Sequence, residues 1–137
     1  MGGRDAQARI SELSQLAEGA PVVIEPVRPD FRQMLPHAAA SVSMCGYITA
    51  MDLLQSGTPA VMVPFDDGNE VEQSLRGQSL SALSAMEVLL SKDLDAARLS
   101  EALQRVISDA PRSTQDFGFD GAQRSVEIAQ RLWDARR

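Results

Sequence analysis

One segment in the middle of the chain restricts the possible folds more than any other. Residues 40–43 are a short β-favouring run, and Gly46 follows where the chain has to turn before a helical pattern begins. Gly57 and Pro59 end that pattern, and residues 60–65 form an apolar run typical of a buried parallel strand. We therefore expect a strand, a glycine turn, a helix and a second strand, the repeating unit of parallel α/β sheets.

The start of this central helix is a candidate anion-binding site. The first N–H groups of a helix lack partners within it, and the helix dipole places partial positive charge there. Gly46 allows a ligand to approach the backbone closely, and the Thr49 hydroxyl is expected beside the same N–H groups. A diphosphate is expected at these positions, with Asp52 one turn further along to bind a ribose diol.

The rest of the chain alternates between helical and strand patterns. This alternation indicates an α/β fold, a Rossmann-like three-layer parallel sheet with about four strands, in a single domain spanning residues 1–137. In the helix after the central unit, Val71, Leu75 and Leu83 are expected to face inward. Helices are predicted at residues 5–18, 31–35, 47–56, 70–83, 93–107 and 121–135, and strands at residues 22–25, 40–43, 60–65 and 86–89.

Composition and charge exclude several classes of protein. The 13 Lys and Arg residues against 19 Asp and Glu give a formal net charge of −6, whereas sequence-independent nucleic-acid binding needs a basic face. One cysteine and one histidine exclude an internal disulfide framework and a conventional structural zinc site. The sequence has no apolar run of membrane-spanning length and no signal-peptide pattern, so we expect a cytoplasmic protein.

The order of a glycine turn, Thr, an acidic residue, Gly-x-Pro, a strand ending in Pro and an acidic-Gln pair resembles a known family. The sequence is similar to the carboxy-terminal donor-binding domain of GT-B glycosyltransferases of the family 28 type, above all the peptidoglycan N-acetylglucosaminyltransferase type and bacterial predicted glycosyltransferases. The resemblance covers roughly residues 5–135 and is carried by Gly46, Thr49, Asp52, Gly57, Pro59, Pro64 and Gln73.

This resemblance implies the donor-binding half of a transferase that moves a hexosyl group to an unknown acceptor. The donor would be a nucleotide-diphosphate sugar, a UDP-sugar in the first place, with no obligatory metal and no other cofactor. The backbone from Gly46 to Thr49 would face the diphosphate, Asp52 would bond the ribose, and Glu72 with Gln73 would contact the sugar hydroxyls. The catalytic base is not identified.

The nucleobase would lie beside the loop at residues 27–31, where the backbone around Arg28 would read its edge. The nucleotide-sugar-binding candidates that the resemblance implies are therefore Arg28, Gly46, Tyr47, Ile48, Thr49, Asp52, Glu72 and Gln73.

The chain departs from the family pattern at several of these positions. Cys45 and Tyr47 stand where many relatives have His or Ser and a second glycine, and Asp52 is shorter than the usual Glu. The turn from Phe65 to Glu72 is one residue longer than in the peptidoglycan enzyme type. These differences bear on nucleotide identity and on the sugar contacts.

A complete domain of this kind begins with two further strands and a Gly-rich loop, and the family's acceptor domain usually supplies the catalytic base. We therefore expect a partial domain that binds the donor but is inactive alone, from a parent that is cytoplasmic or peripheral to the inner membrane. Exposed strand edges would let residues 22–25 pair with residues 40–43, or let two chains form a homo-oligomer. The alternative function is a non-catalytic α/β assembly module that pairs with a partner subunit or with itself.

Simpler interpretations stay open for the proposed ligands. Gly46 and Thr49 also fit a plain strand-to-helix turn, and Asp52 fits a solvated position on a helix. Glu72 and Gln73 also fit the acidic first turn of a helix, which the helix dipole stabilises.

Three other features are better explained by a structural role than by a catalytic or metal-binding one. His37 fits a surface residue better than a general base, because the sequence shows no partner for it. Cys45 fits a small buried residue better than a nucleophile, since no histidine follows it in the chain. Residues 66–69 fit a turn better than a calcium site, because they lack the spaced oxygen ligands and the closing glutamate of an EF-hand.

Overall fold

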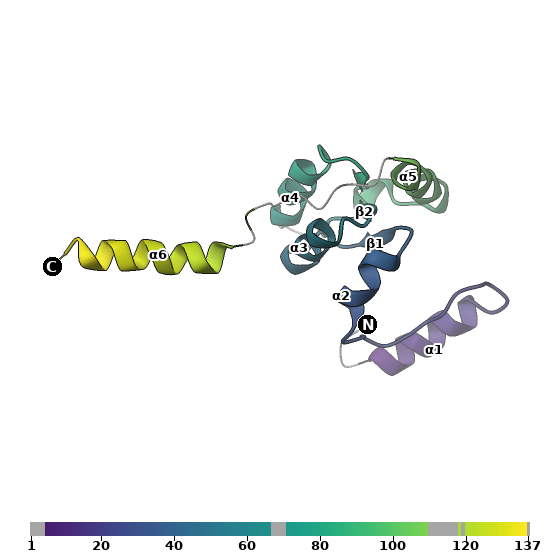
Figure 1. The fold of residues 1–137 in the computed structure, drawn as a ribbon. Coiled ribbons are helices and arrows are strands. Elements are labelled where there is room, and N and C mark those ends of the chain that lie inside the picture. Colours follow the sequence, from purple (N-terminus) through teal and green to yellow (C-terminus); the bar gives the residue numbers. More distant parts are fainter. Residues whose placement is uncertain (1–4, 67–70, 110–117, 119, 137) are drawn as a thin grey trace. The chain divides into compact units, whose positions relative to one another are not determined.

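The computed structural model describes residues 5–66, 71–109, 118 and 120–136 and divides into two units, Met1–Met34 and Leu35–Arg137 (Figure 1). The first unit holds α1 (Ala6–Leu16) and the short α2 (Phe31–Met34). α1 confirms the helix predicted at residues 5–18. Gly19, with a φ of +81°, lies just beyond the end of α1.

The strand predicted at residues 22–25 is not formed. Residues 22–28 carry no regular structure, and the side chains of Val22 and Val23 are exposed. A strand is stabilised by a hydrogen-bonded neighbour and by cross-strand side-chain pairs, and the described part of this unit contains only the helices α1 and α2. The prediction was wrong because it rested on β-propensity, which does not supply a partner.

The second unit is built on a parallel sheet. Its strands β1 (Ser41–Ser43), β2 (Ala60–Met62) and β3 (Met86–Val88) lie in the order β1-β2-β3, with Val42 opposite Val61 and Val61 opposite Glu87. The helices α3 (Tyr47–Ser56) and α4 (Glu72–Leu80) connect successive strands. The predicted α/β fold is confirmed, with three strands in the described residues in place of about four.

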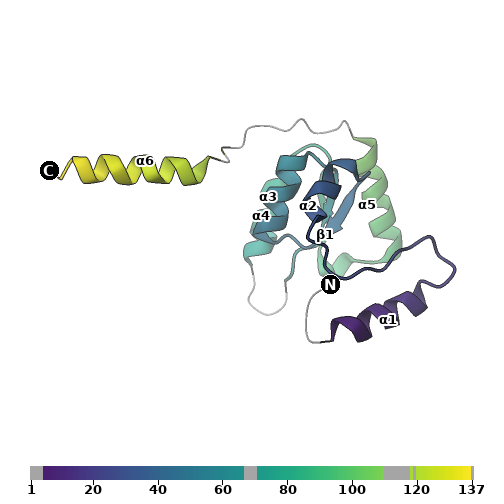
Figure 2. The ribbon, with the colours of Figure 1, turned by 60° about the horizontal axis from the view of Figure 1, so that its bottom comes forward.

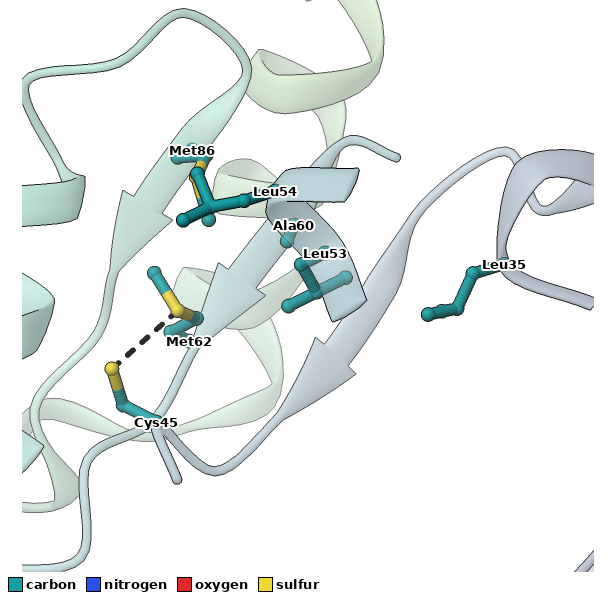
Figure 3. Packing of buried hydrophobic residues seen from close by; sticks show 7 residues of the cluster. All are labelled: Leu35, Cys45, Leu53, Leu54, Ala60, Met62 and Met86. Atoms are coloured by element: carbon teal, nitrogen blue, oxygen red, sulfur yellow. Dashed lines mark hydrogen bonds between the residues drawn. The ribbon is translucent and has the colours of Figure 1, made fainter. Parts of the chain in front are cut away.

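The two faces of β2 build two parts of the core. Figure 2 shows α3 and α4 on one side of the sheet and α5 (Ala96–Ser108) on the other. Val61 packs against Ala102 and Val106 of α5, so α5 forms the third layer on this face of the sheet. On the opposite face, shown in Figure 3, the buried cluster consists of Leu35, Cys45, Leu53, Leu54, Ala60, Met62 and Met86.

The ends of α3 follow from its sequence. Gly57 has a φ of +70°, the left-handed conformation that glycine adopts without a steric penalty, and its N–H donates to the Leu53 carbonyl. Thr58 then donates from Oγ1 to the carbonyl of Leu35 at 2.7 Å. Leu35 opens the 3-10 helix η1 (Leu35–His37), so this bond ties η1 to the residues that lead into β2.

α4 is shorter than the helix predicted at residues 70–83, and residues 67–70 lie outside the described part of the chain, as does most of the turn predicted at residues 66–69. Leu83 packs against the core as expected, but Val71 and Leu75 are exposed. Gly77 is the buried residue of α4. Leu75 is two positions away from it, about 200° around the helix, so its side chain points away from the core.

The last two helices differ in how they pack. α5 begins at Ala96 and not at residue 93, because the Asp95 carboxylate accepts the Arg98 N–H at 2.8 Å and caps it; the 3-10 helix η2 (Ser91–Asp93) precedes this cap. α6 (Gly121–Asp134) confirms the helix predicted at residues 121–135 and buries none of its residues. None of the helices in the described ranges has the length and apolar character needed to cross a bilayer.

Candidate functional site

The site is centred on the turn between β1 and α3. Gly46 is the residue before the helix, with a φ of −65° and a ψ of 151°, an extended conformation that any L-residue adopts. Apart from residue 46 itself and its two neighbours in the chain, no atom of the described residues lies within 4 Å of the position that a Cβ of residue 46 would occupy. Neither backbone strain nor packing within the described chain therefore requires glycine here.

The first turn of α3 presents its backbone donors. No side chain caps the helix, and the first backbone bond that crosses the turn is the one from the Ala50 N–H to the Gly46 carbonyl, at 2.9 Å. The N–H groups of Tyr47, Ile48 and Thr49 come before this bond, where helical donors have no partner within the helix. The side chains of Tyr47 and Ile48 are exposed and that of Thr49 is half-buried.

Cys45 anchors the turn in the core. Its side chain is fully buried, and its Sγ lies 3.5 Å from the Sδ of Met62 on β2 (Figure 3). Burial raises the pKa of the Cys45 thiol, while the charge of Arg76 acts in the opposite direction to a smaller extent. A thiol of this kind is a packing residue, which agrees with the interpretation made from the sequence.

α4 supplies the second side of the site. Gln73 accepts the Phe65 N–H at its Oε1, at 3.1 Å, so its side chain is held just beyond the carboxyl end of β2. Glu72 is exposed and forms an ion pair with Arg76 one turn later. Both of the residues predicted to contact the donor sugar are thus on the first turn of α4, and Glu72 already has a cationic neighbour.

Arg76 is the residue that sequence reasoning did not find. Its Nη1 donates to the Cys45 carbonyl at 2.7 Å, and its guanidinium carbon lies 5.6 Å from the centroid of the Tyr47 ring. These contacts join α4 to the residues on both sides of Gly46. The one signal in the sequence is the spacing of Glu72 and Arg76, four residues apart, which favours a helical ion pair but does not reveal the contact with the turn.

Asp52 is placed differently from the turn residues. It is 8% exposed, lies on α3 with the buried residues Leu53 and Leu54, and is engaged in an interaction inside the protein. The structure therefore buries this carboxylate and gives it an interaction within the protein, in contrast to the solvated helix position that the simpler interpretation expected. Its role as a ribose ligand stays a prediction.

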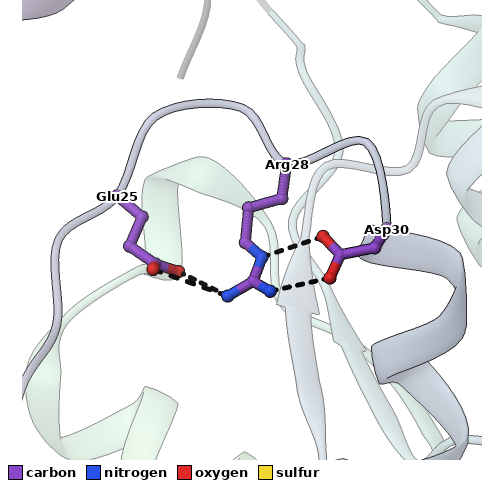
Figure 4. Close-up of polar contacts among 3 residues, drawn as sticks. All are labelled: Glu25, Arg28 and Asp30. Atoms are coloured by element: carbon purple, nitrogen blue, oxygen red, sulfur yellow. Dashed lines mark hydrogen bonds and ion pairs between the residues drawn. The ribbon is translucent and has the colours of Figure 1, made fainter.

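Arg28 lies in the first unit, between two carboxylates (Figure 4). Its Nε and Nη2 donate to the two oxygens of Asp30 at 2.9 and 2.7 Å, and its Nη1 donates to Glu25 at 3.1 Å. The bond to Asp30, and then the one to Glu25, raises the pKa of Arg28, and the same bond lowers the pKa of Asp30. The arrangement fixes the loop at residues 27–31, and its contact with a nucleobase stays a prediction.

The described residues hold no group of three or more His, Cys, Asp or Glu side chains arranged to bind a metal ion. What the turn offers chemically is a set of backbone N–H donors, a nearby hydroxyl and one guanidinium, while α4 adds an amide and a carboxylate. The N–H, hydroxyl and guanidinium donors suit phosphate oxygens. The amide and the carboxylate of α4 suit hydroxyl groups.

Comparison with known proteins finds related transferases. Among curated proteins, the transferases named UDP-N-acetylglucosamine--N-acetylmuramyl-(pentapeptide) pyrophosphoryl-undecaprenol N-acetylglucosamine transferase from Brucella canis and Brucella suis are each 28% identical to this chain over 97 residues. The same values hold for the transferase of that name from Brucella melitensis. The aligned region covers 71% of this chain and 26% of each relative, so the chain corresponds to about a quarter of their length.

The match to a family model is more extensive. Residues 1–132, which include the turn, α3, α4 and the whole sheet, match the model described as the glycosyltransferase family 28 C-terminal domain. The chain therefore belongs to the family of glycosyltransferase family 28 C-terminal domains.

Proposed function

We propose that this domain binds a nucleotide-diphosphate sugar as the donor-binding part of a hexosyl transferase. The diphosphate binds at the backbone N–H groups of Tyr47, Ile48 and Thr49, where the dipole of α3 stabilises the charge that develops on the leaving diphosphate. Family membership supports a transferase. The position of the donor in this site is our inference.

The observation that carries the proposal is the glycine at the turn. Gly46 is in a conformation open to every residue, with no described atom within 4 Å of a Cβ at that position. Neither backbone conformation nor packing calls for glycine there, and its advantage over alanine before a helix is small, whereas a phosphate that approaches the helix start closely favours it. A plain strand-to-helix turn, the simpler interpretation, leaves this open space unexplained.

The other candidates of the second unit contact further parts of the donor: Asp52 bonds the ribose, and Glu72 and Gln73 contact the sugar hydroxyls. The assignment of the nucleobase to the backbone near Arg28 follows from the family resemblance alone. A UDP-sugar is the first choice because the Brucella relatives are named for the use of UDP-N-acetylglucosamine. Transfer itself is expected to require a separate acceptor-binding domain, in a cytoplasmic parent protein or one peripheral to the inner membrane.

Isothermal titration of the 137-residue chain tests this function. UDP and UDP-N-acetylglucosamine are expected to bind saturably, with weaker binding of ADP. Thr49→Val and Asp52→Ala are expected to weaken the binding of UDP. Ser108→Ala is the matched control, because that exposed hydroxyl on α5 donates to the Gln104 carbonyl of its own helix. The proposal fails if the wild-type chain shows no saturable binding of UDP or if both site variants bind it like the control.

A second candidate is an assembly module, and one observation favours it. Among the described residues β1 pairs with β2 on one side only, and the Val42 side chain on β1 is exposed. An open edge of this kind pairs readily with another strand, in a second copy of the chain or in a partner subunit. Sedimentation equilibrium of the wild type and of Val42→Lys tests it: a ligand-independent dimer that the lysine abolishes favours assembly, and a monomer rules out self-association.

A further inference from the structure

We propose that Arg76 binds the diphosphate of the donor directly, and that it exchanges Glu72 for that diphosphate when the donor binds. This inference rests on the proposed function and assigns a residue and a sequence of contacts to its site. It assigns to one guanidinium the preference of the site for a diphosphate over a monophosphate.

The guanidinium of Arg76 is fixed at the turn by two contacts that do not involve a carboxylate. One is the 2.7 Å hydrogen bond from Nη1 to the Cys45 carbonyl, and the other is a cation–π contact in which the guanidinium carbon lies 5.6 Å from the centroid of the Tyr47 ring. Cys45 and Tyr47 are the residues before and after Gly46. The positive charge is therefore held beside the N–H groups that we assign to the diphosphate, with the side chain only 17% exposed.

The contact with Glu72 is of a different kind. The Glu72 side chain is 73% exposed and meets Arg76 across one turn of α4. Water competes for the Glu72 carboxylate, which weakens this ion pair even though the Arg76 side chain is largely shielded. A diphosphate carries more charge and offers oxygens in the planar, two-point geometry that guanidinium prefers. It can therefore replace the carboxylate while the Cys45 carbonyl keeps its bond.

The exchange moves the positive charge of Arg76 to the ligand that carries more negative charge. The chain has a formal net charge of −6, and a carboxylate beside a diphosphate would repel it. In the ligand-free protein Arg76 neutralises Glu72. In the complex Arg76 pairs with the diphosphate, and the Glu72 carboxylate turns to the donor sugar and accepts hydrogen bonds from its hydroxyls. One side chain thus links the two halves of the donor site.

Isothermal titration of the full 137-residue chain with UDP and UMP measures the selectivity that Arg76 confers. Arg76→Gln is expected to weaken UDP binding by about tenfold to a hundredfold, the range for a hydrogen bond between charged groups, and to affect UMP much less. Arg76→Lys keeps the charge without the two-point geometry and should be intermediate. Arg105→Gln is the control, since this 57% exposed arginine pairs with Glu87 on β3 and should leave both affinities unchanged.

Glu72→Gln is the second variant. It keeps the proposal testable if circular dichroism shows that Arg76→Gln does not fold. Removing the competing carboxylate is expected to tighten UDP binding by about threefold, the scale of a weak surface ion pair, while the advantage of UDP-N-acetylglucosamine over UDP declines. Arg76 is merely structural if its substitution weakens UDP and UMP by the same factor, and the exchange is wrong if Glu72→Gln weakens UDP. A wild-type chain that binds no UDP refutes the proposed function itself, and this inference with it.

Discussion

Replacing Gly46 by alanine separates what the ligand requires from what the fold requires. The φ of −65° and ψ of 151° are allowed for alanine, and the new methyl group meets no described atom within 4 Å. Alanine at the residue before a helix is less favourable than glycine by roughly 0.5–1 kcal/mol. Alanine also restricts the unfolded chain more than glycine does, which stabilises the folded state by about 0.4–1 kcal/mol. The two terms nearly cancel, so the free energy of unfolding should stay within about 1 kcal/mol of wild type.

The effect on ligand binding should be larger. A methyl group at residue 46 occupies the space through which a phosphate approaches the first N–H groups of α3. We expect the affinity for UDP to fall about tenfold or more, which corresponds to about 1.4 kcal/mol. Urea denaturation gives the change in stability, and isothermal titration with UDP gives the change in binding.

Gly57→Ala is the matched control at the other end of the same helix. Gly57 has a φ of +70°, so alanine there is strained by about 1–2 kcal/mol and should destabilise the fold. It lies far along α3 from the turn, and the folded variant should bind UDP like wild type. The reasoning is refuted if Gly46→Ala binds UDP normally, or if it destabilises the protein as much as Gly57→Ala does.

Three predictions concern the fold around the site. Asp95→Ala should lower the free energy of unfolding by about 1 kcal/mol in urea denaturation, because it removes the cap of α5, whereas Asp95→Asn should retain most of it. The Cβ of Gly77→Ala would lie 3.2 Å from Val88 Cγ2, so a double-mutant cycle with Val88→Ala should show a favourable coupling of about 1 kcal/mol; additive effects would contradict this contact. Cys45 should react with iodoacetamide at least about a hundredfold faster in urea than in the native protein, because only unfolding exposes its thiol.

The same cysteine sets a direction for the pH dependence of stability. Burial raises the pKa of the folded Cys45 thiol above its unfolded value of about 8.5. The contribution of the thiol to the free energy of unfolding is therefore complete below that pH and is lost as the pH rises through the folded pKa. The reason is that the unfolded chain gives up the proton first. Urea denaturation between pH 7 and 10 should show this decline in the wild type and a smaller one in Cys45→Ala.

Elements with strong local signals were predicted well from the sequence. α3 ends at Gly57 in the left-handed conformation, and β2 is the fully buried parallel strand that the apolar run after Pro59 indicates. Local signals failed where a distant partner decides the structure. Residues 22–25 have the composition of a strand but no described strand to pair with in their unit, and Leu75 has an apolar side chain on the outer side of a short helix.

The candidate site shows the same difference between local signals and distant partners. The turn at Gly46 was predicted because glycine, threonine and the helical pattern follow one another in sequence. Arg76 could not be predicted, since its decisive bond goes to the carbonyl of a residue 31 positions earlier, and backbone carbonyls leave no trace in a sequence pattern. Only the fold, which sets α4 beside the turn, creates the contact.

Arg76 also changes the interpretation of Tyr47. By family resemblance this position often holds a second glycine, and from sequence the tyrosine was a departure that bore on nucleotide binding. In the structure the Tyr47 ring supports the guanidinium of Arg76 at 5.6 Å, and the same guanidinium bonds to the Cys45 carbonyl. An aromatic face attracts the planar guanidinium and helps to keep it oriented. The Tyr47 side chain therefore holds a positive charge next to the turn, so Tyr47→Gly should weaken UDP binding through Arg76 and have little further effect in an Arg76→Gln background.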